Sequence, residues 1–218
     1  NYEPKNSRYQ FYLAQSYFDS QQFEKAEKAY LDRVELGGWE EEVYYSMFRM
    51  AIISTILDRP WQEQSERYLQ AWAYRPIRAE PLHQLARLHR GRGEPRQAYL
   101  YAKHAAELTL PPQDILFISE DVYRWMCVDE IGATAFYCHD FERGASACKY
   151  ILDNNLAPKE DAERVKKNLE TYMKVLMDIE NQKLEQQEKQ TKQKKEPNTE
   201  KKGTKMNPKK GYKKRKKK

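Results

Sequence analysis

The residues of this chain that could do chemistry are four histidines, three cysteines and short runs of carboxylates, and their spacing is poor for catalysis. His83 and His89 are six residues apart, so on one helix they would face different ways and would not form a metal pair. Cys127, Cys138 and Cys148 lack the C-x-x-C spacing of zinc or redox sites. No glycine-rich phosphate loop and no G-x-S-x-G motif occurs. The sequence therefore predicts no catalytic residue, no cofactor and no metal site.

The compartment is suggested by the same cysteines and by the hydropathy. An odd number of cysteines fits reduced core thiols better than a disulfide framework. No run of about 18 apolar residues is present, which predicts no transmembrane segment. No signal peptide is visible. We expect a cytoplasmic protein, with a nuclear location as the alternative that a basic C-terminus would allow.

Three pairs of small residues indicate the elements that make up the fold. Each pair is separated by twelve residues: Ala14 with Ala26, Ala86 with Ala98, and Ala133 with Ala145. Two antiparallel helices approach closely only where side chains are small, while large residues on either side fill the space between neighbouring pairs. This pattern resembles the tetratricopeptide repeat (TPR), a helix–turn–helix unit of about 34 residues. The resemblance implies an all-α, right-handed helical solenoid that presents a surface and does no chemistry itself.

The turns and helix-breaking residues along the chain predict about four repeat units. They cover approximately residues 7–37, 40–76, 79–110 and 120–155, with an irregular insert at 111–117. Pro158 should open a long polar helix that reaches about Gln193 and whose apolar beginning caps the last unit. We expect residues 7–177 to form the solenoid and residues 178–218 a polar helical extension and a disordered lysine-rich tail. Pro4 suggests that residues 1–6 end a preceding repeat; the alternative is a proline-containing lead-in to the first helix.

In such repeats the first helix of each unit lines a concave groove, and the helical register predicts which side chains point into it. They are aromatic, arginine and polar residues, a composition suited to a protein or peptide contact: Arg8, Phe11, Gln15, Phe18, Tyr45, Phe48, Arg49, His83, Arg87, Arg90 and Tyr137. The lysine-and-asparagine clamp with which some repeats hold a carboxylate is excluded, because those positions carry Phe11 and Gln15. Some of the aromatics could equally belong to the core between repeats.

Charge is divided unevenly along the chain, whose formal net charge is +6. Residues 181–218 hold 16 basic and 4 acidic residues, and residues 1–180 hold 23 basic and 29 acidic ones. The tail would bind nucleic acid or another anionic surface nonspecifically by releasing counterions. The residues of this polyanion-binding tail are Lys209, Lys210, Lys213, Lys214, Arg215, Lys216, Lys217 and Lys218.

Four stretches go beyond the generic repeat, at residues 11–17, 37–46, 75–82 and 121–125. They resemble the helical-repeat region that follows the catalytic domain in family-2 glycosyltransferases of bacteria and large DNA viruses. The family's nucleotide-sugar-binding domain has no counterpart here, and its Asp-x-Asp motif is absent. The resemblance implies that a longer product transfers sugars and that this chain is its accessory module, holding an acceptor protein or glycan or mediating oligomerisation. The alternative is a free-standing adaptor whose basic tail binds nucleic acid or another polyanion.

Overall fold

The computed structural model describes residues 6–195, with side chains to residue 191, and this part of the chain is all-α. The lysines and arginine of the tail predicted to bind polyanions, at 209–218, lie outside it, as do residues 1–5. The helices are α1 Ser7–Asp19, α2 Phe23–Leu36, α3 Glu40–Ile56, α4 Trp61–Tyr74, α5 Glu80–Gly91, α6 Pro95–Glu107, α7 Cys127–Thr134, α8 Phe141–Asp153 and α9 Lys159–Lys195. A π-helical turn, Val122–Met126, leads into α7, and a 3₁₀ turn, Ala135–Cys138, follows it.

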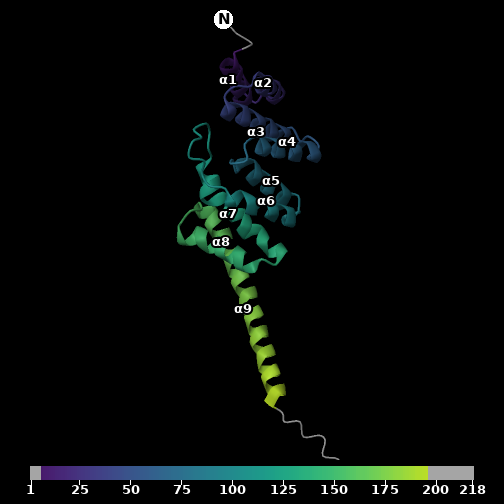
Figure 1. Ribbon diagram of the computed structural model, residues 1–218, viewed down its shortest axis with the longest axis vertical. Helices are drawn as coiled ribbons and strands as arrows, with labels where there is room; N and C mark the ends of the chain where they lie inside the picture. The colour runs from purple at the N-terminus through teal and green to yellow at the C-terminus, as the bar shows by residue number, and fades with distance from the viewer. Residues whose placement is uncertain (1–5, 196–218) are drawn as a thin grey trace, which may run out of the picture. The chain divides into compact units, whose positions relative to one another are not determined.

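Successive helices contact one another in chain order from α1 to α8, which makes a stack of helix pairs (Figure 1). The predicted all-α helical solenoid is confirmed. Small residues lie where the helices meet, since Ala14, Ala26, Ala86 and Ala98 are 0% exposed. Their missing side-chain volume allows close backbone approach, and the large neighbouring residues fill the layers between pairs.

The ends of the helices follow from local chemistry. The Asn6 side chain accepts hydrogen bonds from the backbone N–H groups of Arg8 and Tyr9 and caps α1. Gly37 ends α2 with φ of +62°, a conformation that costs glycine little. These stops set the lengths of the helices and so decide which side chains of neighbouring pairs meet.

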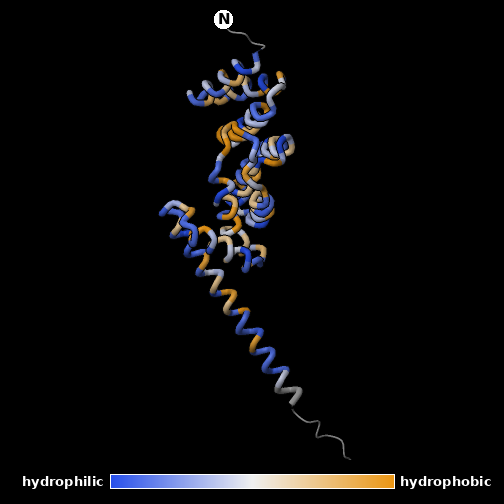
Figure 2. Tube along the Cα trace, turned by 60° about the vertical axis from the view of Figure 1, so that its left-hand side comes forward, coloured by the Kyte–Doolittle hydropathy of each residue, from blue (hydrophilic) through white to orange (hydrophobic). Residues whose placement is uncertain are grey.

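The chain divides into two compact units, Asn1–Met177 and Asp178–Lys218. In the first unit the beginning of α9 packs against α7 and α8 through Val165 and Tyr172, which are 0% and 2% exposed. It thus serves as the capping helix of the last pair. In the second unit, as far as the helix is described, hydrophilic residues predominate along α9 (Figure 2), and Leu184 is an exposed exception.

Candidate functional site

Three pockets follow one another where α5, α7 and the start of α9 meet. Their volumes are about 310, 390 and 240 Å³. The first two share Arg90 and Arg164, and the last two share Ala133, Tyr137 and Asn168. They form one groove, called here the cap groove, which lies wholly within the first compact unit.

Two arginines of the cap groove are fixed by carboxylates. Arg90 donates to both oxygens of Glu130 at 2.8 and 2.9 Å. Arg164 donates to both oxygens of Asp129 at 3.1 and 2.8 Å and to Asp161 at 2.9 Å. Burial raises the pKa of the Asp129 carboxyl, and the hydrogen bonds from Arg164 oppose that rise. Bidentate pairs of this kind hold planar groups in one orientation and give the groove a rigid polar wall.

Two further side chains of the first pocket, His83 and Arg87, have polar groups that could contact a ligand. His83 is 4% exposed, and its Nδ1 has no hydrogen-bond partner among the described residues. Burial lowers the pKa of His83 to about 4, so the imidazole is neutral at pH 7. Arg87 is exposed and has no carboxylate within 4.0 Å in the described part of the chain; it makes a long hydrogen bond of 3.4 Å to Gln84. The pocket therefore offers an unpaired guanidinium beside a neutral imidazole.

Four residues predicted to line a groove come together in the cap groove: His83, Arg87, Arg90 and Tyr137. The other seven lie on α1 and α3: Arg8, Phe11, Gln15, Phe18, Tyr45, Phe48 and Arg49. The predicted set is thus divided between two places on the helix stack.

The residues on α1 and α3 are largely engaged with one another. Phe11 is 1% exposed, because the rings of Tyr45 and Phe117 lie beside it with centroids 5.9 and 6.5 Å away. The Arg49 guanidinium carbon lies 3.3 Å from the ring centroid of Phe18. Phe11 is therefore a core residue in this structure and is closed to a ligand.

The remaining predicted residues of this region are more accessible. Gln15 and Phe48 are half-buried, and Phe48 packs against the buried cluster that contains Ala51 and Tyr68. The Arg8 side chain is 52% exposed and lies 3.1 Å from a carboxylate oxygen of Glu42. Arg8 and Gln15 thus keep some exposed surface, while the aromatic rings of this region mainly fill space between helices.

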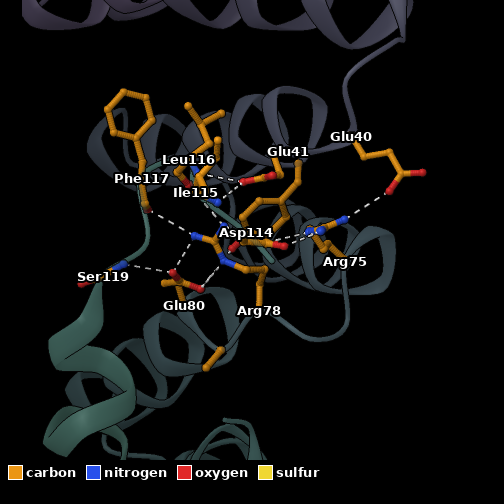
Figure 3. A network of polar contacts seen from close by, with 12 residues as sticks. Glu40, Glu41, Arg75, Arg78, Glu80, Asp114, Ile115, Leu116, Phe117 and Ser119 are labelled. Carbon is orange, nitrogen blue, oxygen red and sulfur yellow. Dashed lines mark hydrogen bonds and ion pairs between the residues drawn. The ribbon is translucent and has the colours of Figure 1, made fainter. Parts of the chain in front are cut away.

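A second polar cluster is centred on Arg78, which is 1% exposed and precedes α5 (Figure 3). Arg78 donates to both oxygens of Glu80 at 3.0 and 2.7 Å and to Asp114 at 3.3 Å. Asp114 also accepts hydrogen bonds from Arg75. These contacts tie the start of α5 to the insert loop, residues 108–121, which joins α6 to the π-helical turn.

The sequence did not reveal the part that α9 has in the cap groove. Asp161, Arg164 and Asn168 are three and four residues apart, which places them on one helical face, beside the buried Val165. That polar stripe was visible in the sequence, but nothing local indicated that it would face α5 and α7. A cap was predicted here; its contribution to a binding surface was not.

No group of three or more His, Cys, Asp or Glu residues between 6 and 195 is arranged to hold a metal ion. None of the described helices is long and apolar enough to span a bilayer. The three cysteines are free thiols, and burial raises the pKa of Cys127 and Cys148 to about 12, which keeps both protonated and unreactive.

Comparisons with known proteins give likenesses of fold alone. No protein-family model and no curated protein matches the chain. Yeast Tom70 matches over 80% of this chain with 14% identity and a TM-score of 0.42. A Podosopora anserina chain of nearly identical TPR-like repeats of the kinesin light chain type matches over 79%, with 14% identity and a TM-score of 0.45. The chain spans 41% of the Tom70 chain and 97% of the other. The contacts between successive helices within this chain show its stack of helix pairs independently of these likenesses.

Proposed function

We propose that this chain is a non-catalytic interaction module that binds a segment of a partner protein in the cap groove. The observation that supports this is the run of three connected pockets. In them an exposed Tyr137 and an Arg87 that has no carboxylate partner among the described residues lie beside fixed ion pairs. Arginine and tyrosine are the side chains that most often dominate binding energy at protein interfaces.

The frame is suited to binding because it is already rigid. Arg90 and Arg164 are held by carboxylates in the unliganded chain, so little side-chain freedom remains to be lost when a partner docks. Arg87 and Tyr137, exposed on opposite sides of Arg90 along the groove, would then supply the contacts that discriminate between partners.

The test is selection of peptides from a displayed random library on the purified chain, followed by affinity measurement. Selected peptides should lose about tenfold in affinity with Arg87→Ala or Tyr137→Ala, equivalent to about 1.4 kcal/mol. The matched control is Arg124→Ala, since the Arg124 side chain is 60% exposed and lines none of the three pockets. Peptides that bind all variants equally would place binding elsewhere and contradict the proposal.

We further propose that the module is the accessory C-terminal part of a glycosyltransferase, holding an acceptor or mediating oligomerisation. The support is the resemblance of residues 11–17, 37–46, 75–82 and 121–125 to that family's repeat region. On this proposal, residues 7–177 form four repeat units and a cap, while residues 1–5 and 196–218 lie outside the described residues. The intact mass and N-terminal sequence of the native product test the glycosyltransferase proposal. A product longer by 200 residues or so, with Asp-x-Asp upstream, supports that proposal.

The charge concentrated in residues 181–218 favours a second candidate, a free-standing adaptor that contacts nucleic acid or another polyanion. Binding to a nonspecific RNA or DNA should then weaken steeply with salt, because counterion release drives it. A chain ending at residue 195 would lose that binding and keep peptide binding in the cap groove. A native product that begins near Asn1 would favour this candidate over the glycosyltransferase module.

A further inference from the structure

The insert loop lies along the first helices of three successive units. Phe117 contacts Phe11 of α1 and Tyr45 of α3, while Ser119 N donates to Glu80 of α5 at 3.2 Å. In Figure 1 the loop leaves the start of the π-helical turn and rises towards α3. The first helices of the pairs line one face of a helix-pair stack. The loop therefore occupies that face over the first three helix pairs, α1–α2, α3–α4 and α5–α6.

A side chain of α3 and one from the segment just before α5 hydrogen-bond to the backbone of this loop. One oxygen of Glu41 accepts hydrogen bonds from the N–H groups of Ile115 at 2.8 Å and Leu116 at 2.7 Å. Arg78 donates to the carbonyl oxygens of Leu116 at 3.3 Å and Phe117 at 3.2 Å (Figure 3). Side chains from elsewhere in the chain thus satisfy the main chain of residues 115–117, as a receptor does for a bound peptide.

Two side chains anchor the loop at positions three residues apart. The Asp114 carboxylate is fully buried and is bound by Arg75 and Arg78. The Phe117 residue is 51% exposed, and its ring lies 4.6 Å from the ring of Tyr45, centroid to centroid. Between the anchors, Ile115 is 80% exposed and adds little to recognition, whereas Leu116 is half-buried and packs against the core around Phe11. The recognised pattern is therefore an aspartate followed, after two residues, by an aromatic residue.

Arg78 has partners that do not belong to residues 114–117. Arg78 is paired with Glu80, and its guanidinium carbon lies 4.6 Å from the ring centroid of Tyr44. Tyr123 donates to Glu80 at 2.8 Å from the π-helical turn. Because Arg78 keeps a buried partner and a stacking surface when residues 114–117 are displaced, its guanidinium is preorganised for a second segment.

We propose that residues 114–117 are a built-in occupant of a peptide site formed by Glu41, Tyr45, Arg75 and Arg78, which binds Asp-x-x-aromatic segments and is closed to partners while the chain fills it. This site is separate from the cap groove and does not depend on its function. It accounts for the engagement of Phe11 and Tyr45, which were expected to face a ligand. A partner carrying the same pattern would have to displace the loop.

The experiment supplies the loop sequence in trans. The loop-released variant carries Asp114→Gly, Ile115→Ser, Leu116→Gly and Phe117→Ser in the full chain. The probe is a fluorescein-labelled peptide with the sequence of residues 111–119, and the control peptide has Asn at the position of Asp114. Anisotropy should show saturable binding to the variant, at least tenfold weaker binding of the control peptide, and no binding to the wild type. A folded variant that does not bind, or that binds both peptides equally, would overturn the proposal.

A milder variant keeps the proposal testable where the fourfold change prevents folding. Asp114→Asn should raise hydrogen exchange at the Ile115 and Leu116 amides, since it removes the buried carboxylate that anchors the loop. The same variant should bind the Asp-containing peptide. Unchanged exchange would show that Asp114 is not an anchor, and faster exchange without peptide binding would show that the loop is only a structural strut; either result overturns the proposal.

Discussion

The ring of Tyr172 lies against the backbone of Gly144, so closely that a Cβ on Gly144 would stand 2.2 Å from the Tyr172 ring carbon Cζ. The Tyr172 hydroxyl donates to the Gly132 carbonyl at 3.0 Å and accepts from the Phe136 N–H at 2.9 Å. One side chain of α9 therefore reaches between α7 and α8 through a space that only glycine leaves. This contact fixes the wall of the cap groove that α9 provides.

We expect Gly144→Ala to destabilise the fold, because the added methyl overlaps the Tyr172 ring and forces α9 away from α8. The cost should be about 1–3 kcal/mol, as for other overpacked sites. Urea unfolding measures it. Gly91→Ala is the control, since no atom lies within 4 Å of a Cβ at that helical position. Equal stability of the two variants would contradict the tight contact.

Removing the guanidinium of Arg78 should have a larger effect. Arg78→Met leaves the carboxylates of Glu80 and Asp114 buried without that partner, and breaking buried pairs in this way costs about 3–5 kcal/mol. Arg124→Met is the matched control, because the Arg124 side chain is 60% exposed and its pair with Asp121 lies on the surface. Chemical denaturation of both variants would show whether the buried network stabilises the fold, and a loss below 1 kcal/mol or so for Arg78→Met would argue that it does not.

Acid should weaken the hold on the insert loop. The pKa of Asp114 is below its ordinary value, mainly because Arg75 donates hydrogen bonds to the carboxylate. The unfolded chain then takes up the proton first, so Asp114 contributes stability above its unfolded pKa of about 3.9, and this is lost as the pH falls through the folded pKa. Unfolding midpoints of the wild type and Asp114→Asn should therefore converge as the pH falls through the folded pKa of Asp114. A difference that stays constant with pH would assign no such role to the carboxylate.

His83 should make the free energy of unfolding depend on pH in a range above the one in which Asp114 titrates. Burial lowers its pKa to about 4, against an unfolded value of about 6.5. Between these values the unfolded chain binds the proton more readily, so the free energy of unfolding falls as the pH drops from about 6.5 to 4. NMR titration of the imidazole gives the pKa directly, and His83→Gln should flatten this part of the stability profile. A midpoint near 6.5 would contradict the buried, neutral histidine.

The stacking of helix pairs could be predicted because its signals are local. Small residues twelve apart, such as Ala86 and Ala98, let two helices approach closely, and both are fully buried. The cap groove was predicted in part for the same reason, since His83, Arg87 and Arg90 share one face of α5. Helical register identifies the face of a helix, but it does not say what covers that face.

The remaining contacts join residues that are far apart in the sequence and show no periodic pattern. Arg78 and Asp114 are separated by 36 residues, and nothing near either one indicates the other. The insert at 111–117 was recognised as irregular, yet its place over Phe11 depends on tertiary contacts of this kind. The residues of α9 in the cap groove were missed likewise, because the direction in which a capping helix docks is not encoded in its own spacing.

The π-helical turn Val122–Met126 has a consequence for recognising relatives of this chain. Such a turn holds one residue more than an α-helical turn, and each residue rotates a helix by about 100°. A relative that lacks one residue there would present α7 in a different rotation and would separate Glu130 from Arg90 and Asp129 from Arg164. A single-residue gap at this point of an alignment would therefore distinguish chains that lack the groove from chains that share it, even where the helix pairs align throughout.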